Sequence, residues 1–348
     1  MTMLAEVFDT VIGVDTHKHT HTAAVLAAAT GAVLDEVTVS TDPDGFDQLI
    51  EMADRHGTLR AWSIEGAGSY GAGLARYLAA REELVIEIER PERPGRRHGA
   101  KSDPIDAVRA GREALAQEHH AQPRAEGDRA ALAVLLAARR SAVKATGDAQ
   151  RQIHALITTA PETIRARFRG LTVTKTMAAA ASLRVGSSWD TETRTYAEAL
   201  RTLARRCRTL QAEAITHEHA ILAIVKAWRP DLLEVQGIGP INAATILCAW
   251  SHPGRCRNEA AFANLAGVAP LPASSGLTVR HRLNRSGDRD LNRALHFIAL
   301  TRLRHDPETR AYAERRRADG KTDREIKRCL KRYIARRIYN QLEHHPTP

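Results

Sequence analysis

The chain has 348 residues, of which 51 are Lys or Arg and 41 are Asp or Glu, so its formal net charge is +10 at pH 7. Two or three domains are expected, because domains usually hold about 100 to 200 residues. The basic balance favours a polyanionic partner over an acidic small molecule. No stretch offers the run of about 18 apolar residues that a membrane span requires, which argues against a membrane protein.

The charge is unevenly distributed along the chain. Residues 1–60 hold ten acidic and three basic residues, whereas residues 301–348 hold fourteen basic and seven acidic ones. This asymmetry predicts an acidic metal site near one end and phosphate contacts near the other. The four cysteines form no CxxC pair and no signal peptide precedes the first apolar segment, so a reduced, cytoplasmic location is expected.

The first predicted elements are three strands joined by tight turns, followed by alternating helices and strands. The strands are expected at 11–15, 21–29, 33–40, 59–65 and 84–88, and the helices at 45–55, 71–81 and after residue 103. Together they predict an α/β domain over 8–122 with a mixed sheet. The element order is that of a ribonuclease H-like fold, although order alone discriminates weakly.

The rest of the chain is predicted to be mainly helical. Residues 128–228 are rich in Ala, Leu, Arg, Glu and Gln with apolar side chains three and four apart, which predicts long antiparallel arms of coiled-coil type. The stretch 158–193, with its Pro, Gly, Ser and Thr residues, is expected to interrupt them. A third domain over 229–342 ends in a basic helical tail.

Four carboxylates are the strongest candidates for catalysis. Asp15 and Glu65 each follow an apolar run at the end of a predicted strand, where an unused charge costs desolvation. Asp103 and Asp106 lie three residues apart on one predicted helical face. Magnesium prefers carboxylate oxygens, so their convergence predicts a Mg²⁺-dependent phosphoryl-transfer site. On their own, however, the last two fit helix capping and the helix dipole better.

A second candidate is the turn Gly237-Ile238-Gly239, which resembles a helix-hairpin-helix with backbone amides free to meet a phosphate. The alternative is an ordinary turn between helices. The histidines show no zinc-binding spacing, and the alternating His17, His19 and His21 are expected on an exposed strand face.

A third candidate is the serine loop near residue 275. Ser274 and Ser275 lie among small residues and precede Arg280, Arg282 and Arg285, which suits a nucleophile supported by cations. Ser-Ser-Gly is also common in surface turns, so the residues alone favour an ordinary loop.

Five motifs in this order resemble the IS110 family of insertion-sequence transposases. They are 13–18 (GVDTHK), 64–70 (IEGAGSY), 101–107 (KSDPIDA), 237–239 (GIG) and 262–270 (FANLAGVAP). The resemblance covers nearly the whole chain. It implies a RuvC-like DEDD domain, a helical coiled-coil region and a carboxy-terminal transposase domain.

The resemblance also implies roles for the candidates. Asp15, Glu65, Asp103 and Asp106 correspond to a tetrad that binds magnesium, and Ser275 corresponds to a serine that joins covalently to the cut strand, with Ser274 the adjacent alternative. It further implies donor and target DNA as substrates, a structured bridge RNA as guide, and a homodimer or homotetramer whose protomers share each site.

The predicted function is therefore DNA transposition by a guided recombinase. Two alternatives stay open from the sequence. One is a metal-only nuclease of the Holliday-junction-resolving type, which would need no serine. The other is a non-enzymatic nucleic-acid-binding protein, in which the acidic residues are structural.

Overall fold

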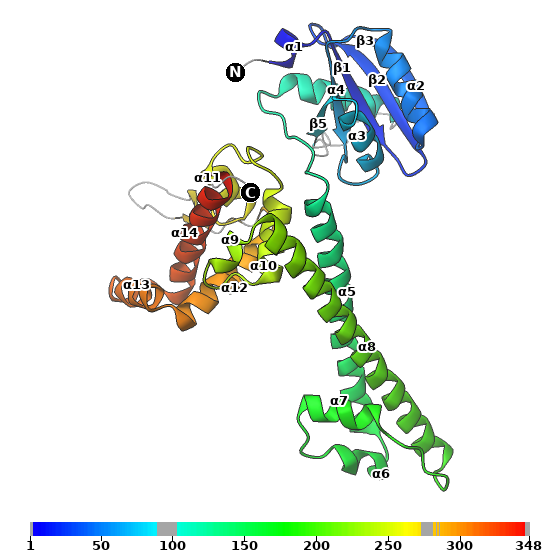
Figure 1. Cartoon of the computed structure of the whole chain (residues 1–348), viewed down its shortest axis with the longest axis vertical. Helices are drawn as coiled ribbons and strands as arrows, with labels where there is room; N and C mark the ends of the chain where they lie inside the picture. The colour runs from blue at the N-terminus through cyan, green and yellow to red at the C-terminus, as the bar shows by residue number, and fades with distance from the viewer. Residues whose placement is uncertain (1–2, 89–102, 273–280, 283, 285, 345–348) are drawn as a thin grey trace. The chain divides into compact units, whose positions relative to one another are not determined.

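The computed structural model describes residues 3–88, 103–272, 281–282, 284 and 286–344 (Figure 1). The chain divides into two compact units, Met1–Arg124 and Ala125–Pro348. Each unit has hydrophobic cores of its own.

The first unit is built on a five-stranded mixed sheet with the strand order β3-β2-β1-β4-β5. β1 pairs antiparallel with β2, and β2 with β3, whereas β1, β4 and β5 are parallel. The elements are α1 (Leu4–Val7), β1 (Thr10–Thr16), β2 (Thr20–Ala27), β3 (Val33–Ser40), α2 (Pro43–Asp54), β4 (Arg60–Glu65), α3 (Ala72–Ala79), β5 (Leu84–Ile88) and α4 (Asp103–Ala116). The predicted mixed sheet with helices is thereby confirmed.

Successive side chains of β1 point to opposite faces of the sheet. Ile12 and Val14 belong to the core beneath α2 and α3, whereas Val11 packs in the cluster that includes Ala114 of α4. Side chains two apart in a strand share a face. Gly13 and Asp15 therefore lie on the α4 side with Val11.

Helix α4 lies unusually close to β1. A Cβ atom placed on Gly13 would collide with the carbonyl oxygen of Ala107 and come within 2.5 Å of the backbone nitrogen of Gly111. The hydroxyl of Ser63 in β4 also donates a buried hydrogen bond of 2.7 Å to the carbonyl of Ala110. Glycine permits this approach of two backbones, which fixes where α4 begins relative to the strand ends.

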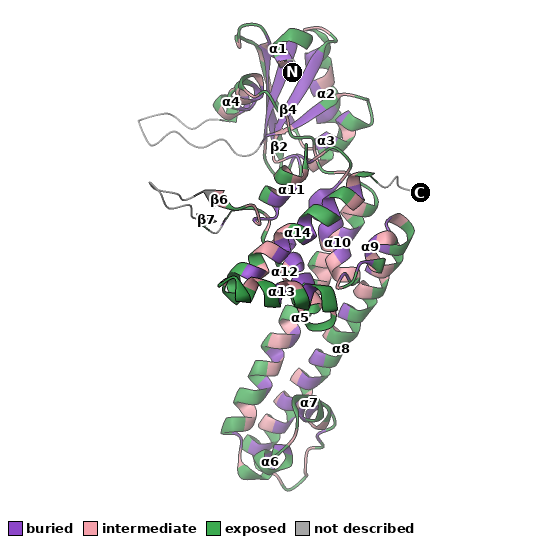
Figure 2. Ribbon diagram, turned by 90° about the vertical axis from the view of Figure 1, so that its left-hand side faces the viewer, coloured by how far each residue is buried: buried purple, intermediate pink, exposed green. Residues whose placement is uncertain are grey.

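The second unit contains two long antiparallel helices, α5 (Asp128–Thr159) and α8 (Thr191–Trp228), which run side by side (Figure 1). The predicted interruption at 158–193 forms a small helical cap whose core includes Ile164, Phe168 and Met177. The cap consists of α6 (Glu162–Arg165), η1 (Ala166–Phe168) and α7 (Val173–Ala181). Buried and exposed residues alternate along both long helices (Figure 2).

The remaining helices share one core with the beginning of α5 and the end of α8. They are α9 (Asp231–Glu234), α10 (Pro240–Trp250), α11 (Glu259–Leu265), α12 (Arg289–His305), α13 (Pro307–Ala318) and α14 (Asp323–His344), with the short strands β6 (Leu271–Pro272) and β7 (His281–Arg282) between α11 and α12. Within the described ranges, no helix combines the length and apolar character that a membrane span needs.

Candidate functional site

Two of the four predicted carboxylates lie at the ends of adjacent parallel strands. Val14 of β1 is in register with Ile64 of β4, so Asp15 and Glu65 follow at neighbouring positions. The hydroxyl of Thr16 donates a hydrogen bond of 2.8 Å to the backbone carbonyl of Glu65, which ties the two strand ends together. The carboxyl ends of β1 and β4 thus meet at one edge of the sheet.

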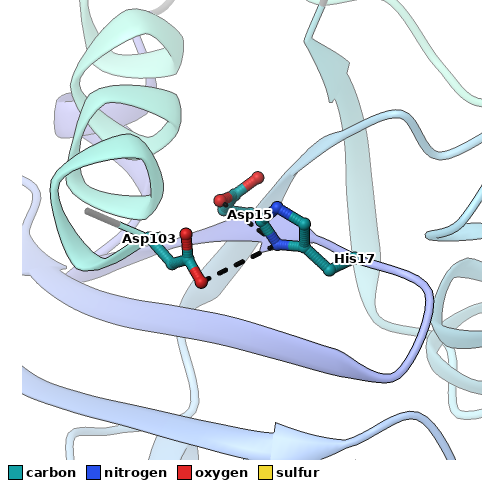
Figure 3. A group of neighbouring side chains, drawn as sticks. All are labelled: Asp15, His17 and Asp103. Atoms are coloured by element: carbon teal, nitrogen blue, oxygen red, sulfur yellow. Dashed lines mark ion pairs between the residues drawn. The ribbon is translucent and has the colours of Figure 1, made fainter. Parts of the chain in front are cut away.

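The other two carboxylates occupy the first turn of α4, which packs over the same face. His17 connects Asp103 to the strand end: its Nδ1 lies 3.6 Å from Oδ2 of Asp15 and 4.0 Å from Oδ2 of Asp103 (Figure 3). Asp106 accepts a hydrogen bond of 2.8 Å from Arg109 one turn later in the helix.

The charges of the other three carboxylates all act on Asp15. Burial raises the pKa of Asp15, the neighbouring imidazole of His17 lowers it, and the charges of Glu65, Asp106 and Asp103 each raise it further. Asp15 itself is only 8% exposed. Like charges held together in this way are destabilising unless a cation or protons compensate them.

The donor set fits a divalent cation. Asp15, His17 and Asp103 each offer one ligand atom, and these atoms lie within 4.8 Å of one another. Carboxylate oxygens suit hard cations such as magnesium and calcium, whereas an imidazole nitrogen also suits manganese, iron or zinc. The residues at this edge of the sheet therefore support a metal centre.

His17 was missed as a site residue by the sequence reasoning. The prediction that the three alternating histidines form an exposed face is wrong for His21, which is fully buried and stacks on Phe46 with ring centroids 5.8 Å apart. A usable signal was present: His17 lies two residues after Asp15, on the same side of the extended chain.

The predicted glycine hairpin lies between α9 and α10. Gly237 has a φ of +89°, a conformation that favours glycine, and a Cβ there would come within 3.2 Å of the carbonyl of Ile298. Gly239 is the exposed N-cap residue of α10, and no atom of the described residues lies within 4 Å of its Cβ position. Gly237 therefore fits the packing against α12, and the start of α10 is open to a ligand.

The predicted serine loop is only partly described. Ser274, Ser275, Arg280 and Arg285 lie outside the described residues, whereas Arg282 is exposed at the end of β7. β6 and β7 pair antiparallel through Leu271 and Arg282, which closes the base of the loop.

Comparison with known proteins places this arrangement in a family. Residues 12–160 match a transposase model of the DEDD type from IS110 elements, and residues 230–314 match a model described as the IS116/IS110/IS902 transposase family. The chain belongs to the IS110 family of transposases. The stretch that matches the first model includes all four carboxylates, and the stretch that matches the second includes the glycine hairpin and the serine loop.

Two curated relatives agree with this placement. The uncharacterized 43.6 kDa protein of insertion element IS110 from Streptomyces coelicolor is 32% identical over 119 residues, which is 34% of this chain and 28% of the relative. The uncharacterized 42 kDa protein of insertion element IS900 from Mycobacterium paratuberculosis is 32% identical over 121 residues, 33% of this chain and 29% of the relative. The matched stretch thus spans less than a third of either relative.

Proposed function

We propose that this protein is a DNA transposase that cuts and rejoins strands at the ends and target of an insertion element. The observation that carries the proposal is the convergence of Asp15, Glu65 and the first turn of α4 on one sheet edge, in a chain of the IS110 family. The mixed sheet supports a ribonuclease H-like domain over 8–122. The coiled-coil arms over 128–228 and the transposase domain over 229–342 are parts of the same proposal.

In this proposal Asp15, Glu65, Asp103 and Asp106 hold Mg²⁺, and His17 orients the carboxylates of Asp15 and Asp103. A bound divalent cation supplies charge neutralisation for the phosphate oxygens of a strand being cut. Arg109 holds the side chain of Asp106 in place through its hydrogen bond of 2.8 Å. The burial of Asp15 strengthens the electrostatic interactions of its own carboxylate.

Ser275 is the proposed nucleophile, with Ser274 as its neighbouring alternative. Its hydroxyl oxygen would bond to phosphorus while the phosphodiester bond to one deoxyribose oxygen breaks, and that oxygen leaves with a proton. Arg280, Arg282 and Arg285 would neutralise the charge that develops on the phosphate. Rejoining reverses these steps with the hydroxyl of a second strand.

The proposed partners are donor DNA, target DNA and a structured guide RNA encoded beside the gene. The net charge of +10 and the open start of α10 beyond Gly237 and Gly239 support nucleic-acid binding. The paired α5 and α8 helices offer an extended surface for a homodimer or homotetramer.

The test uses purified full-length protein with magnesium, end-labelled donor and target DNA, and RNA transcribed from the flank of the element. Denaturing gels compare the wild type with Ser275→Ala and Asp15→Asn. We expect a protein-linked DNA adduct and a recombined product in the wild type, and neither in Ser275→Ala. Cutting that persists in Ser275→Ala without any adduct would contradict the serine role and indicate a metal-only nuclease. Unchanged cutting and joining in Asp15→Asn would contradict the metal site.

A further inference from the structure

The second unit contains a basic cavity of about 790 Å³ between the end of α11 and one side of α14. Its volume lies in the range of about 300 to 1,000 Å³ that is usual for ligand sites. The backbone of residues 267–270 forms one wall. The cations that line it are Arg282, Lys321, Arg328, Lys331, Arg332 and Arg336.

The acidic groups near this basic cavity compensate only part of its charge. Of the described residues that line the cavity, Glu325 is the acidic one, and its carboxylate accepts hydrogen bonds of 2.8 and 2.7 Å from the backbone and hydroxyl of Thr322. Glu259 binds Arg332 with two hydrogen bonds and lies 3.4 Å from Arg336.

Four lining cations have no carboxylate this close. Among the described residues, no carboxylate lies within 4.0 Å of the charged nitrogens of Arg282, Lys321, Arg328 or Lys331, although the charge of Glu325 interacts with those of Lys321 and Arg328 at longer range. The basic cavity thus keeps an excess of positive charge that the second unit itself does not neutralise.

Lys331 is the most informative of these residues because it is only 9% exposed. Its Nζ donates a hydrogen bond of 2.8 Å to the amide oxygen of Asn292, a neutral group. Burial, with a contribution from the charge of Arg328, lowers the pKa of Lys331. An ammonium group in this position is stabilised by an anion.

A second buried cation in the same unit, Arg229, is paired with a carboxylate. Arg229 is 1% exposed and forms two hydrogen bonds of 2.8 and 2.7 Å with the carboxylate of Asp231. It also donates to the backbone carbonyls of Gln341 and Leu342. Arg229 is therefore a structural cation, whereas no carboxylate of the described residues lies within 4.0 Å of the ammonium group of Lys331.

The basic cavity also lies at the base of the segment that carries Ser275. The amide nitrogen of Asn292, whose oxygen holds Lys331, donates hydrogen bonds of 2.7 and 3.2 Å to the carbonyls of Ala266 and Gly267. After the segment, the backbone nitrogen of Asp288 donates a hydrogen bond of 2.6 Å to the carbonyl of Leu265. Lys331 is thus connected through one side chain to the point where the segment leaves α11.

We propose that the basic cavity binds a backbone phosphodiester of a nucleic-acid strand, with Lys331, Arg328 and Arg282 as its charge partners. The identity of the ligand as nucleic acid rests on the proposed function. A strand held there by its phosphate would lie beside residues 267–270 and Arg282, the described residues on either side of the segment that carries the predicted nucleophile. Contacts between these cations and a phosphate position the strand but do not read its base sequence.

The test measures binding of full-length protein to fluorescently labelled duplex DNA and to duplex RNA of the same sequence, by anisotropy over a range of salt concentrations. The variants are Lys331→Met, which keeps the side-chain length, and Arg328→Gln on the exposed rim. Arg324→Gln is the matched control, because Arg324 is an exposed arginine of α14 that does not line the cavity.

Each cavity variant should weaken binding about threefold to tenfold and reduce the salt slope for DNA by about 0.9, the amount expected for one lost phosphate contact. The control should leave the slope unchanged. Weaker binding and a smaller salt slope with duplex DNA would assign the site to a DNA strand. The same changes with duplex RNA alone would assign it to RNA. Unchanged slopes in both arms would overturn the proposal.

Thermal melting without nucleic acid separates this proposal from a structural role of Lys331. Removing an uncompensated buried charge should leave the melting temperature of Lys331→Met equal or higher. A lower melting temperature with an unchanged salt slope would mean that Lys331 only supports the loop base, and would overturn the proposal. Since neither measurement uses strand cutting, failure of the proposed chemistry would be distinguished from failure of the phosphate site.

Discussion

The acidic cluster of the first unit and the basic cavity of the second unit concentrate opposite charge by different means. The acidic cluster uses short side chains whose positions are set by strand register and by the contact of Gly13 with α4. The basic cavity uses long side chains, most of them from the single helix α14. Geometry is fixed by the backbone in the first case and by flexible side chains in the second.

This difference predicts two kinds of response to substitution. Metal ligands must meet one ion at defined distances, so loss or displacement of one carboxylate affects the whole centre. Phosphate contacts by several cations are nearly independent, so each loss in the basic cavity has a graded effect. The acidic cluster is accordingly the place where single changes should have the largest consequences.

The largest effect is expected for Asp15→Asn. This change removes the most buried carboxylate and should lower strand cutting by at least about a hundredfold, since even outer partners of a metal site cost about 10- to 100-fold. Gel assays of cutting at saturating magnesium measure the effect. Asp44→Asn, at an exposed acid of α2 in the same unit, is the matched control and should cut normally. An equal loss of strand cutting in both variants would mean that the change in net charge, and not the loss of a cluster carboxylate, lowers the activity.

A somewhat smaller effect is expected for Gly13→Ala, which changes no charged group. The new methyl would collide with the backbone of α4, and relieving this overpacking should cost about 1 to 3 kcal/mol of unfolding free energy. Because the first turn of α4 carries Asp103 and Asp106, stabilisation by divalent cations should also decrease.

Gly73→Ala is the control for this prediction, because its Cβ would meet only ordinary contacts with the ring of Phe46 at 3.5 Å or more. That change replaces a glycine inside α3 and should be neutral or stabilising by up to about 1 kcal/mol. Thermal melting with and without magnesium measures both variants. Equal melting temperatures for the two would argue against the role of the Gly13 contact.

The coarse fold was predictable because both units carry strong periodic signals. Apolar runs ending at Asp15 and Glu65 identified two of the strands, and three- and four-residue spacing identified the long helices. The pairing of Val14 with Ile64 was not predictable, because register depends on contacts between distant segments.

The two site features that the sequence did not reveal depend on the same kind of contact. His17 and His21 look alike in the sequence, yet one lies beside Asp15 and the other is buried against Phe46. The role of Lys331 depends on Asn292, which is 39 positions away. The two-residue spacing of Asp15 and His17 is compatible with their contact, but spacing along the chain carries no information on the pairing of Lys331 with Asn292.

A change of about tenfold is expected for His17→Gln. The imidazole lies near the carboxylates of Asp15 and Asp103, and loss of a positioning partner of this kind usually weakens metal affinity about 10- to 100-fold. Calorimetric titration with Mg²⁺ and Mn²⁺ separates two roles for this residue. If the variant loses more affinity for Mn²⁺ than for Mg²⁺, His17 is a direct nitrogen ligand. If it loses equal affinity for both ions, His17 is a positioning residue. Unchanged affinity for both ions would exclude His17 from the centre.

The smallest effect is the pH dependence of stability in the cation-free protein. Burial and the neighbouring carboxylates raise the pKa of Asp15 above its value in the unfolded chain, so the folded state binds this proton more tightly. The resulting stabilisation is fully present below the ordinary carboxyl pKa and is lost as the pH rises through the raised pKa of Asp15. In the presence of EDTA, the melting temperature of the wild type should therefore decrease over that interval relative to Asp15→Asn. Addition of magnesium should remove the difference in slope, because a bound cation compensates the same repulsion that the proton relieves. Parallel profiles for the two proteins in EDTA would mean that neither burial nor the neighbouring carboxylates raise the pKa of Asp15 in the folded state.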